Sequence, residues 1–217
     1  MTPASSPGGE PFDFTVIGSE TVYDGAILAL RVDELTMPGD RTARREVVEH
    51  HGAVAIVACN DDGAIATVTQ YRHPVRRRLR ELPAGLMDSG GDESPVEAAR
   101  RELMEEVGVE ADRWHTLVDV ASSPGFTDEA LRVFVAEGLH TVDRPDAHDE
   151  EADMDIDWIP LDDAVAMVFA GEVVNVTSVC GILALAHVRA TGADLRDPDS
   201  PWVDQPTALD RRHAARK

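Results

Sequence analysis

Basic residues, cysteines and long apolar runs are all scarce in this chain of 217 residues. Its 20 lysines and arginines stand against 41 aspartates and glutamates, which gives a formal net charge of −21 at pH 7. The phosphates of nucleic acids and of anionic membranes would repel such a surface, so we expect neither as a partner. No apolar run approaches the roughly 18 residues of a membrane-spanning helix.

The two cysteines, Cys59 and Cys180, lie within apolar stretches. We expect both to be small buried side chains in a reducing compartment. The first residues, MTPASSPGGEP, are polar and lack the apolar core of a secretory signal, so we predict a cytoplasmic location. Neither the HExxH pattern of zinc proteases nor the D-x-D-x-D-G spacing of calcium-binding EF-hands is present.

Three glutamates, Glu102, Glu105 and Glu106, lie within five positions of the sequence. In a helix these positions share one face, where like charges repel at roughly 0.2–0.5 kcal/mol per pair. A solvated acidic face is the ordinary explanation of such a stripe. A divalent cation is the alternative, because Mg²⁺ prefers hard oxygen ligands and leaves positions open for water and phosphate.

The residues around these glutamates predict a well-defined helix. Ser94-Pro95-Val96-Glu97 fits a capping box with proline at the first helical position, and Gly108 is a C-terminal stop signal. Arg101 lies four residues before Glu105, so we expect it to brace the carboxylates. The predicted buried stripe consists of Val96, Ala99, Leu103 and Val107.

This segment resembles the signature of the Nudix hydrolase family: glycine, five residues, glutamate, seven residues, then Arg-Glu-aliphatic-x-Glu-Glu-x-Gly-aliphatic. Glu93 and Arg101–Val109 match the second half at every position. Gly85 departs from the pattern, because seven residues separate it from Glu93. We interpret the difference as a two-residue insertion in the loop Asp88–Asp92, where Gly90-Gly91 indicates a turn. The role of Glu93 stays open for this reason.

The rest of the chain predicts a mixed sheet flanked by helices, which agrees with the α+β class and the Nudix-type α/β/α sandwich that the resemblance implies. We expect a disordered arm at 1–13, an N-terminal β region at 14–50, a Nudix domain at 51–195 and a tail without firm structure at 196–217. The predicted strands are Phe14–Ser19, Ala26–Leu35, Arg44–Glu49, Ala53–Cys59, Ala64–Tyr71, Trp114–Ser122, Leu131–Glu137 and Asp155–Ile159. Further helices are predicted at Leu161–Ala170 and Val173–Thr191.

Stretches outside the signature resemble the ADP-ribose pyrophosphatase branch of the family. They read QYRHP at 70–74, ELPAGL at 81–86 and SSPGFTDE at 122–129, and the likeness spans about residues 44 to 180. An ordinary Pro-Gly turn would explain the third stretch by itself, but the three together favour this branch. The branch implies Mg²⁺-dependent hydrolysis of ADP-ribose to AMP and ribose 5-phosphate, with Mn²⁺ as a substitute. It also implies a homodimer that exchanges its N-terminal strands and helps to form each adenine pocket.

The same resemblance assigns roles to individual residues. Metal binding falls to the carboxylates of Glu102, Glu105 and Glu106 and to the backbone carbonyl of Ala84. Arg101 and Glu105 belong to the catalytic set. Substrate binding falls to Arg72, Glu46, Glu81, Pro124, Gly125 and Phe126. Within that group, Arg72 would contact a phosphate or the terminal ribose, and Glu46 would contact the adenine edge.

The catalytic base is expected in the acidic loop 141–153, TVDRPDAHDEEAD, which precedes the last predicted strand. Counting back from Met154 places Glu150 at the family's base position, with Glu151 as the neighbouring candidate. A solvated acidic loop is the alternative explanation. Whichever of the two glutamates acts as the base would take a proton from the water that attacks phosphorus.

Other functions stay open at this point. The first alternative is the same reaction on a different substrate, either another nucleoside diphosphate sugar or NADH. A different class is a non-catalytic Nudix module that senses ADP-ribose, and a third is a structural or calcium-binding acidic domain. The complete set of helix carboxylates favours an enzyme over a sensor, and a substrate panel separates the remaining candidates.

Overall fold

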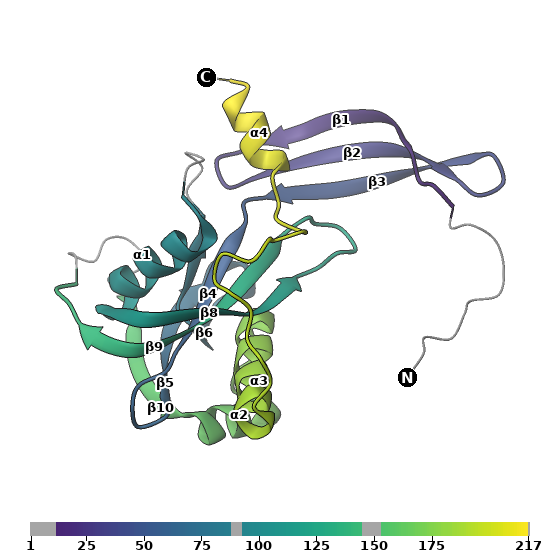
Figure 1. Cartoon of the computed structure of the whole chain (residues 1–217). Helices are drawn as coiled ribbons and strands as arrows, with labels where there is room; N and C mark the ends of the chain where they lie inside the picture. Colours follow the sequence, from purple (N-terminus) through teal and green to yellow (C-terminus); the bar gives the residue numbers. More distant parts are fainter. Residues whose placement is uncertain (1–11, 88–92, 145–152, 217) are drawn as a thin grey trace.

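Strand β4 (Ala53–Ala58) is buried on both faces and organises the core of the protein. The computed structural model describes residues 12–87, 93–144 and 153–216. Val54 and Ile56 pack with helix α1 (Pro95–Val107), whereas Ala55 and Val57 pack with helix α3 (Val176–Thr191). A strand with apolar side chains on both faces belongs between two helical layers. The predicted α/β/α sandwich is therefore confirmed (Figure 1).

Two sheets form the body of the sandwich. The central sheet has the order β7-β4-β9-β8 and is mixed, because β4 runs parallel to β9 while β7 and β8 pair antiparallel with their neighbours. The second sheet, β10-β5-β6, is antiparallel. The bounds are β5 (Ala64–Arg72), β6 (Arg77–Glu81), β7 (Ala84–Leu86), β8 (Val109–Ala121), β9 (Ala130–Thr141), β10 (Asp155–Pro160) and α2 (Leu161–Ala170), with a short 3₁₀ turn at His73–Val75.

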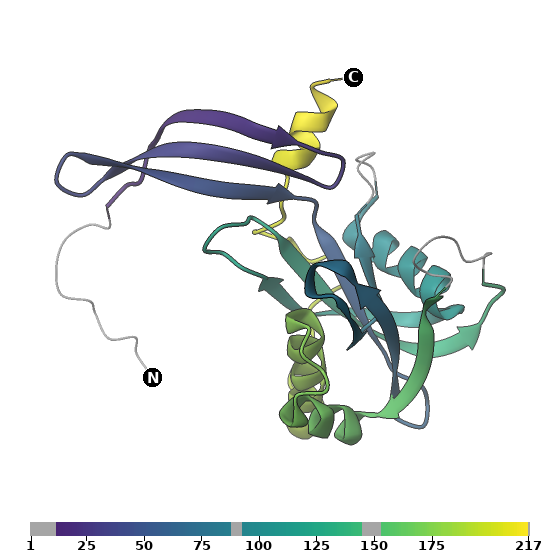
Figure 2. The same ribbon diagram turned by 180° about the vertical axis from the view of Figure 1, so that it is seen from behind.

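A third, antiparallel sheet precedes the sandwich in the chain. It consists of β1 (Val16–Asp24), β2 (Leu28–Met37) and β3 (Arg41–His50) and extends to one side of the body (Figure 2). The three strands were predicted here, although β1 lies further along the chain than Phe14–Ser19. More than half of the surface of several apolar side chains in this region is exposed: Phe14, Val16, Ile17, Val22, Tyr23 and Ile27.

Helix α1 begins and ends where the capping signals predict. The backbone N–H of Ser94 donates to Oε2 of Glu97 at 2.8 Å, and the backbone N–H of Glu97 donates to the hydroxyl of Ser94 at 3.4 Å. The hydrogen bonds from Ser94 lower the pKa of Glu97. Gly108 ends the helix with φ of 74°, a left-handed conformation that glycine adopts without steric cost.

Several element predictions were wrong in detail. Strands β6 and β7 were not predicted, because β6 is mostly charged and β7 has three residues. Strand β8 begins at Val109, directly after the helix, rather than at Trp114. Helix α3 begins at Val176 instead of Val173. The tail contains a helix, α4 (Ala208–Ala214), where no firm structure was predicted.

The C-terminal segment, residues 196 to 216, ties the sandwich to the N-terminal sheet. Arg132 on β9 is 1% exposed and donates to the carbonyl of Ser200 at 2.6 Å. Helix α4 then reaches β3, where Arg212 donates to both carboxylate oxygens of the buried Glu49 at 2.8 Å. Both anchors use buried charges that are paired and hydrogen-bonded, so the segment fixes how the N-terminal sheet sits on the sandwich.

Arg212→Ala is expected to lower the free energy of unfolding at pH 7 by about 1–2 kcal/mol. The substitution leaves the buried Glu49 with Arg31, 2.6 Å away, as its cationic partner among the described residues. The hydrogen bond from Arg212 lowers the pKa of Glu49 below its ordinary value of 4.5. The ionised Glu49 therefore stabilises the fold fully above about pH 4.5, the ordinary pKa of the group. This contribution is lost as the pH falls through the lowered pKa of the folded state.

Denaturant unfolding at neutral pH and below pH 4.5 checks this prediction, since the gap between wild type and variant should narrow in acid. Arg211→Ala is the matched control, because Arg211 lies on the same helix and donates to Thr207 within its own segment. Equal losses in the two variants, or a gap that does not depend on pH, would contradict the role of Arg212.

In the part of the chain that the structure describes, no helix is long and apolar enough to cross a membrane. Three predictions from the sequence concern residues outside that part. The first is the predicted disordered N-terminal arm, of which residues 1–11 lie outside. The second is the loop insertion at 88–92. The third is the choice of Glu150 or Glu151 as the catalytic base.

Candidate active site

A cavity of about 630 Å³ opens where β4, β6, β7 and the start of α3 meet. Its lining includes three residues predicted for substrate or metal binding, Arg72, Glu81 and Ala84, together with Gly85. The volume falls within the range of roughly 300–1,000 Å³ of small-molecule sites. This cavity is the candidate active site.

Glu81 is the centre of a polar network in one wall of the cavity. Its side chain is 2% exposed, and its Oε2 accepts hydrogen bonds from Nε and Nη2 of Arg72 at 3.0 and 2.7 Å. The amide of Asn175 donates to Oε1 at 3.0 Å, and that of Gln70 donates to Oε2 at 3.3 Å. Charge-assisted bonds of this kind fix the plane of a guanidinium group. Glu81 thus orients Arg72, while its own contact with substrate stays a prediction.

The sequence did not single out Asn175, which joins this wall to α3. Its Oδ1 accepts a hydrogen bond from the backbone N–H of Ser178 at 3.0 Å, so Asn175 is the N-cap of the helix. Asparagine before an apolar helical pattern is a recognised cap signal. The contact with Glu81 spans 94 positions, and no local pattern predicts a pair so far apart.

The glutamates of α1 pack against β7 beside this cavity. Oε2 of Glu106 accepts a hydrogen bond from the backbone N–H of Ala84 at 2.9 Å. A Cβ atom at Gly85 would lie 2.0 Å from the carboxylate carbon of Glu102, so the absence of a side chain lets this carboxylate reach the backbone. Glu102 and Glu106 are 8% and 5% exposed. The structure therefore brings Ala84, Glu102 and Glu106 together at the edge of the cavity.

Arg101 lies among the carboxylates of the helix. Its Nη1 donates to Glu102 and, at 3.1 Å, to Oε2 of Glu105, and its Nε donates to Oε1 of Glu93 at 2.9 Å. The bonds to Glu93 and the charge of Glu102 raise the pKa of Arg101, although burial acts in the opposite direction. Glu93 thus holds Arg101 in place despite the insertion that precedes it.

The donor chemistry of this cluster fits a hard divalent cation. Glu93, Glu102, Glu105 and Glu106 bring four negative charges to one partly buried site, and Arg101 offsets one of them. Buried charge of one sign is costly unless a counter-ion neutralises it. Within residues 12–87, 93–144 and 153–216, no three acidic, histidine or cysteine side chains stand arranged as a ready metal cage. In the side-chain positions seen here, Arg101 bonds to two of the glutamates proposed as ligands.

Comparison with known proteins decides the family. The NUDIX domain profile matches residues 49–175, which include helix α1 and every residue of the Glu81 network. The chain belongs to the Nudix family. Its match begins at the end of β3 and continues to the N-cap of α3.

The relatives of this Nudix chain include two ADP-ribose pyrophosphatases. The chain is 52% identical to an ADP-ribose pyrophosphatase of Mycobacterium tuberculosis over 204 aligned residues. The alignment covers 94% of this chain and 98% of that protein. An ADP-ribose pyrophosphatase of Bacillus subtilis is 35% identical over 177 residues, 82% of this chain and 95% of the relative. A crystal structure of an ADP compounds hydrolase superposes with a TM-score of 0.74 at 20% identity, covering 85% of this chain and 99% of that one. This likeness supports the fold alone.

The segment 122–129 of the Nudix domain approaches the cavity from another side. Ser122 and Glu129 line the cavity, whereas Pro124, Gly125 and Phe126 are exposed and lie outside its lining. The segment is held by the end of β3, where the backbone N–H of Val48 donates to the carbonyl of Phe126 at 2.8 Å. The substrate contacts assigned to the three exposed residues stay predictions.

Two residues near the cavity, His50 and Asp128, were not predicted to belong to the site. His50 lines the cavity, and its backbone N–H donates to Oδ1 of Asp128 at 2.9 Å. Burial raises the pKa of the Asp128 carboxyl. Glu46, by contrast, lies exposed on β3 and outside the lining, so its predicted contact with adenine stays a prediction.

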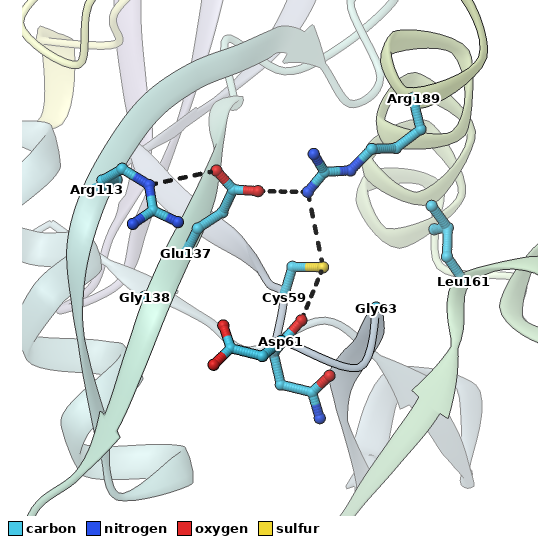
Figure 3. Close-up of a pocket in the computed structure, with 9 residues that line it drawn as sticks. Cys59, Asp61, Gly63, Arg113, Glu137, Gly138, Leu161 and Arg189 are labelled. Carbon is cyan, nitrogen blue, oxygen red and sulfur yellow. Dashed lines mark hydrogen bonds and ion pairs between the residues drawn. The ribbon is translucent and has the colours of Figure 1, made fainter.

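A second cavity, of about 390 Å³, lies at the other end of β4 (Figure 3). Figure 3 shows Glu137 between the guanidinium groups of Arg113 and Arg189. The hydrogen bond from Arg189 lowers the pKa of Glu137. Cys59 is buried here, as predicted, with its Sγ 3.8 Å from Nη2 of Arg189, whereas Cys180 is only half-buried. The lining also contains Asp61, so two carboxylates balance the two guanidinium groups, and we assign this cavity no part in catalysis.

Gly85→Ala is expected to lower turnover about 10–100-fold, the scale seen when a group that orients a metal ligand is disturbed. The new methyl group would meet the carboxylate of Glu102, which must swing away from the backbone. Gly52→Ala is the matched control, since its methyl group would meet other atoms only at 3.4 Å or more. Steady-state kinetics on both variants, with circular dichroism to verify folding, checks the prediction. Unchanged turnover in Gly85→Ala would contradict it.

Proposed function

We propose that this Nudix protein hydrolyses the pyrophosphate bond of ADP-ribose and releases AMP and ribose 5-phosphate. The observation that carries the proposal is one cavity that contains both the oriented guanidinium of Arg72 and the Ala84–Gly85 backbone against which Glu102 and Glu106 pack. The site thus combines a group for a bound anion with carboxylates suited to a cation. The ADP-ribose pyrophosphatases among its relatives support the choice of substrate.

The proposed reaction depends on Mg²⁺, with Mn²⁺ as a substitute. Glu102, Glu105, Glu106 and the carbonyl of Ala84 would hold the metal, which would neutralise the pyrophosphate oxygens. Arg101 would position the carboxylates, and Arg72 would bind a phosphate or the terminal ribose. On the sequence alone, Glu150 or Glu151 is the proposed base that takes the proton of the attacking water.

The proposal extends to a cytoplasmic homodimer with exchanged N-terminal strands. Several side chains of the N-terminal sheet, among them Val16, Ile17, Val22 and Tyr23, are 53–58% exposed, which is typical of a surface that another chain covers. Glu46 and Phe126 would then help to form an adenine pocket shared with the partner subunit. Light scattering at micromolar concentration should give twice the chain mass of 23.5 kDa. The mass of one chain would contradict the dimer.

Incubation of the purified protein with Mg²⁺ and a substrate panel tests the proposed activity. The panel contains ADP-ribose, other nucleoside diphosphate sugars and NADH. We expect ADP-ribose to give the highest kcat/KM, with AMP and ribose 5-phosphate as products. Faster hydrolysis of another compound would replace ADP-ribose as the substrate. Binding of ADP-ribose without any hydrolysis would instead indicate a sensing module.

A further inference from the structure

Two arginines stand opposite each other at the β5–β6 hairpin. Arg72, at the end of β5, is the register partner of Arg77, at the start of β6. Side chains directly opposite in neighbouring antiparallel strands emerge on the same face of the sheet. Like charges in this position destabilise a sheet unless a negative group offsets them, and the buried Glu81 pairs with Arg72.

Alternation along β6 sends its arginines to two different faces. Arg78 and Arg80 share one face, where Arg78 pairs with Asp153 and Arg80 pairs with Asp157 at 2.7 Å. Arg77 belongs to the other face, together with Glu81, whose buried carboxylate lines the cavity. Across residues 12–87, 93–144 and 153–216, no ion pair includes Arg77.

Arg77 lies outside the lining of the cavity but directly opposite Arg72, which belongs to it. Arg72 bonds to the buried carboxylate of Glu81, so this pair contributes little net charge. Arg72 and Pro74 both line the cavity, which places the hairpin at its edge. The chain carries a net charge of −21, so a dianionic ligand needs a local positive group to enter. The exposed Arg77, on the same face of the hairpin as Arg72, is a candidate for that charge.

We propose that Arg77 acts with Arg72 to bind the diphosphate of the substrate and is a specificity-determining residue for diphosphate ligands. The inference rests on the proposed function of this cavity. Arg72, fixed by Glu81, provides the oriented contact, and the exposed Arg77 provides a second guanidinium on the same face. A charge-assisted bond of this kind contributes about tenfold or more to affinity.

Calorimetric titration with ADP-ribose in EDTA tests the proposal without turnover. Arg77→Gln should weaken binding about tenfold or more, whereas Arg77→Lys, which keeps the charge, should retain most of the affinity. In Mg²⁺, Arg77→Gln should raise KM by a similar factor and leave kcat within about threefold, since the lost contact is made equally in ground and transition states.

Arg76→Asn is the matched control. Arg76 is exposed, lies one position away and has φ of 53°, a left-handed conformation that asparagine tolerates. The control removes one positive charge from the same hairpin and should bind ADP-ribose like the wild type. Equal weakening of ADP-ribose binding in Arg76→Asn and Arg77→Gln would overturn the proposal, because the loss of any positive charge from the hairpin would then explain the weaker binding. Wild-type affinity in Arg77→Gln would overturn it as well.

The two proposals fail in different ways. A wild-type protein that binds ADP-ribose through Arg77 in EDTA but does not hydrolyse it in Mg²⁺ would contradict the proposed function and support the role of Arg77. A protein that hydrolyses ADP-ribose with equal KM in wild type and Arg77→Gln would support the proposed function and overturn the role of Arg77.

Discussion

Glu106→Gln is expected to lower kcat for ADP-ribose about 10³-fold with the fold intact, because several kcal/mol of metal-assisted charge stabilisation depend on the carboxylates. Glu106 is 5% exposed, and Ala84 donates to its Oε2 at 2.9 Å. Glutamine keeps the shape of the side chain, and its oxygen can still accept this hydrogen bond, so the change removes the charge and retains the contact with Ala84. Circular dichroism in EDTA should verify that the variant stays folded.

Glu97→Gln is the matched control for this experiment. Glu97 lies on the same helix and takes part in the capping box with Ser94, a role that glutamine also fills. Its activity should stay close to that of the wild type. A wild-type kcat in Glu106→Gln would separate this carboxylate from catalysis, and an equally low kcat in both variants would show that the loss is not specific to Glu106.

Glu150→Gln is expected to lower kcat about 10²–10⁴-fold, the usual scale for loss of a general base. The expectation comes from sequence, since Glu150 and its neighbour Glu151 lie outside the described residues. Mg²⁺ uptake, measured by calorimetry, should be unchanged, because the metal is assigned to helix α1. Glu151→Gln separates the two candidates, since the true base is the residue whose loss removes turnover. Full activity in both variants would show that the base lies elsewhere.

Local signals in the sequence predicted helix α1 and its glutamates well. Ser94, Glu97 and Gly108 define the helix ends within a few residues, so no distant contact is needed to place them. The carboxylates follow from the same helix, because their spacing fixes the face they share. The position of Arg101 among them could be inferred for the same reason.

Features that depend on distant contacts were missed. Strand β6 has a charged sequence, RRLRE, and is held by pairing with β5 and by ion pairs from Arg78 and Arg80 to residues beyond position 150. Helix α4 is short and is stabilised by Leu209, which is fully buried, and by the bond between Arg212 and Glu49. Propensity alone rarely supports a helix of seven residues, so tertiary packing decides such cases.

Calorimetric titration of Mg²⁺ with ADP present as a diphosphate tests the central claim most directly. The claim is that the helix carboxylates bind a divalent cation next to a diphosphate. After subtraction of the Mg²⁺ that ADP alone binds, it predicts saturable Mg²⁺ uptake by the wild type and by Glu97→Gln, and loss of that uptake in the double variant Glu102→Gln/Glu106→Gln. Equal uptake in the double variant, or none in the wild type, would contradict it.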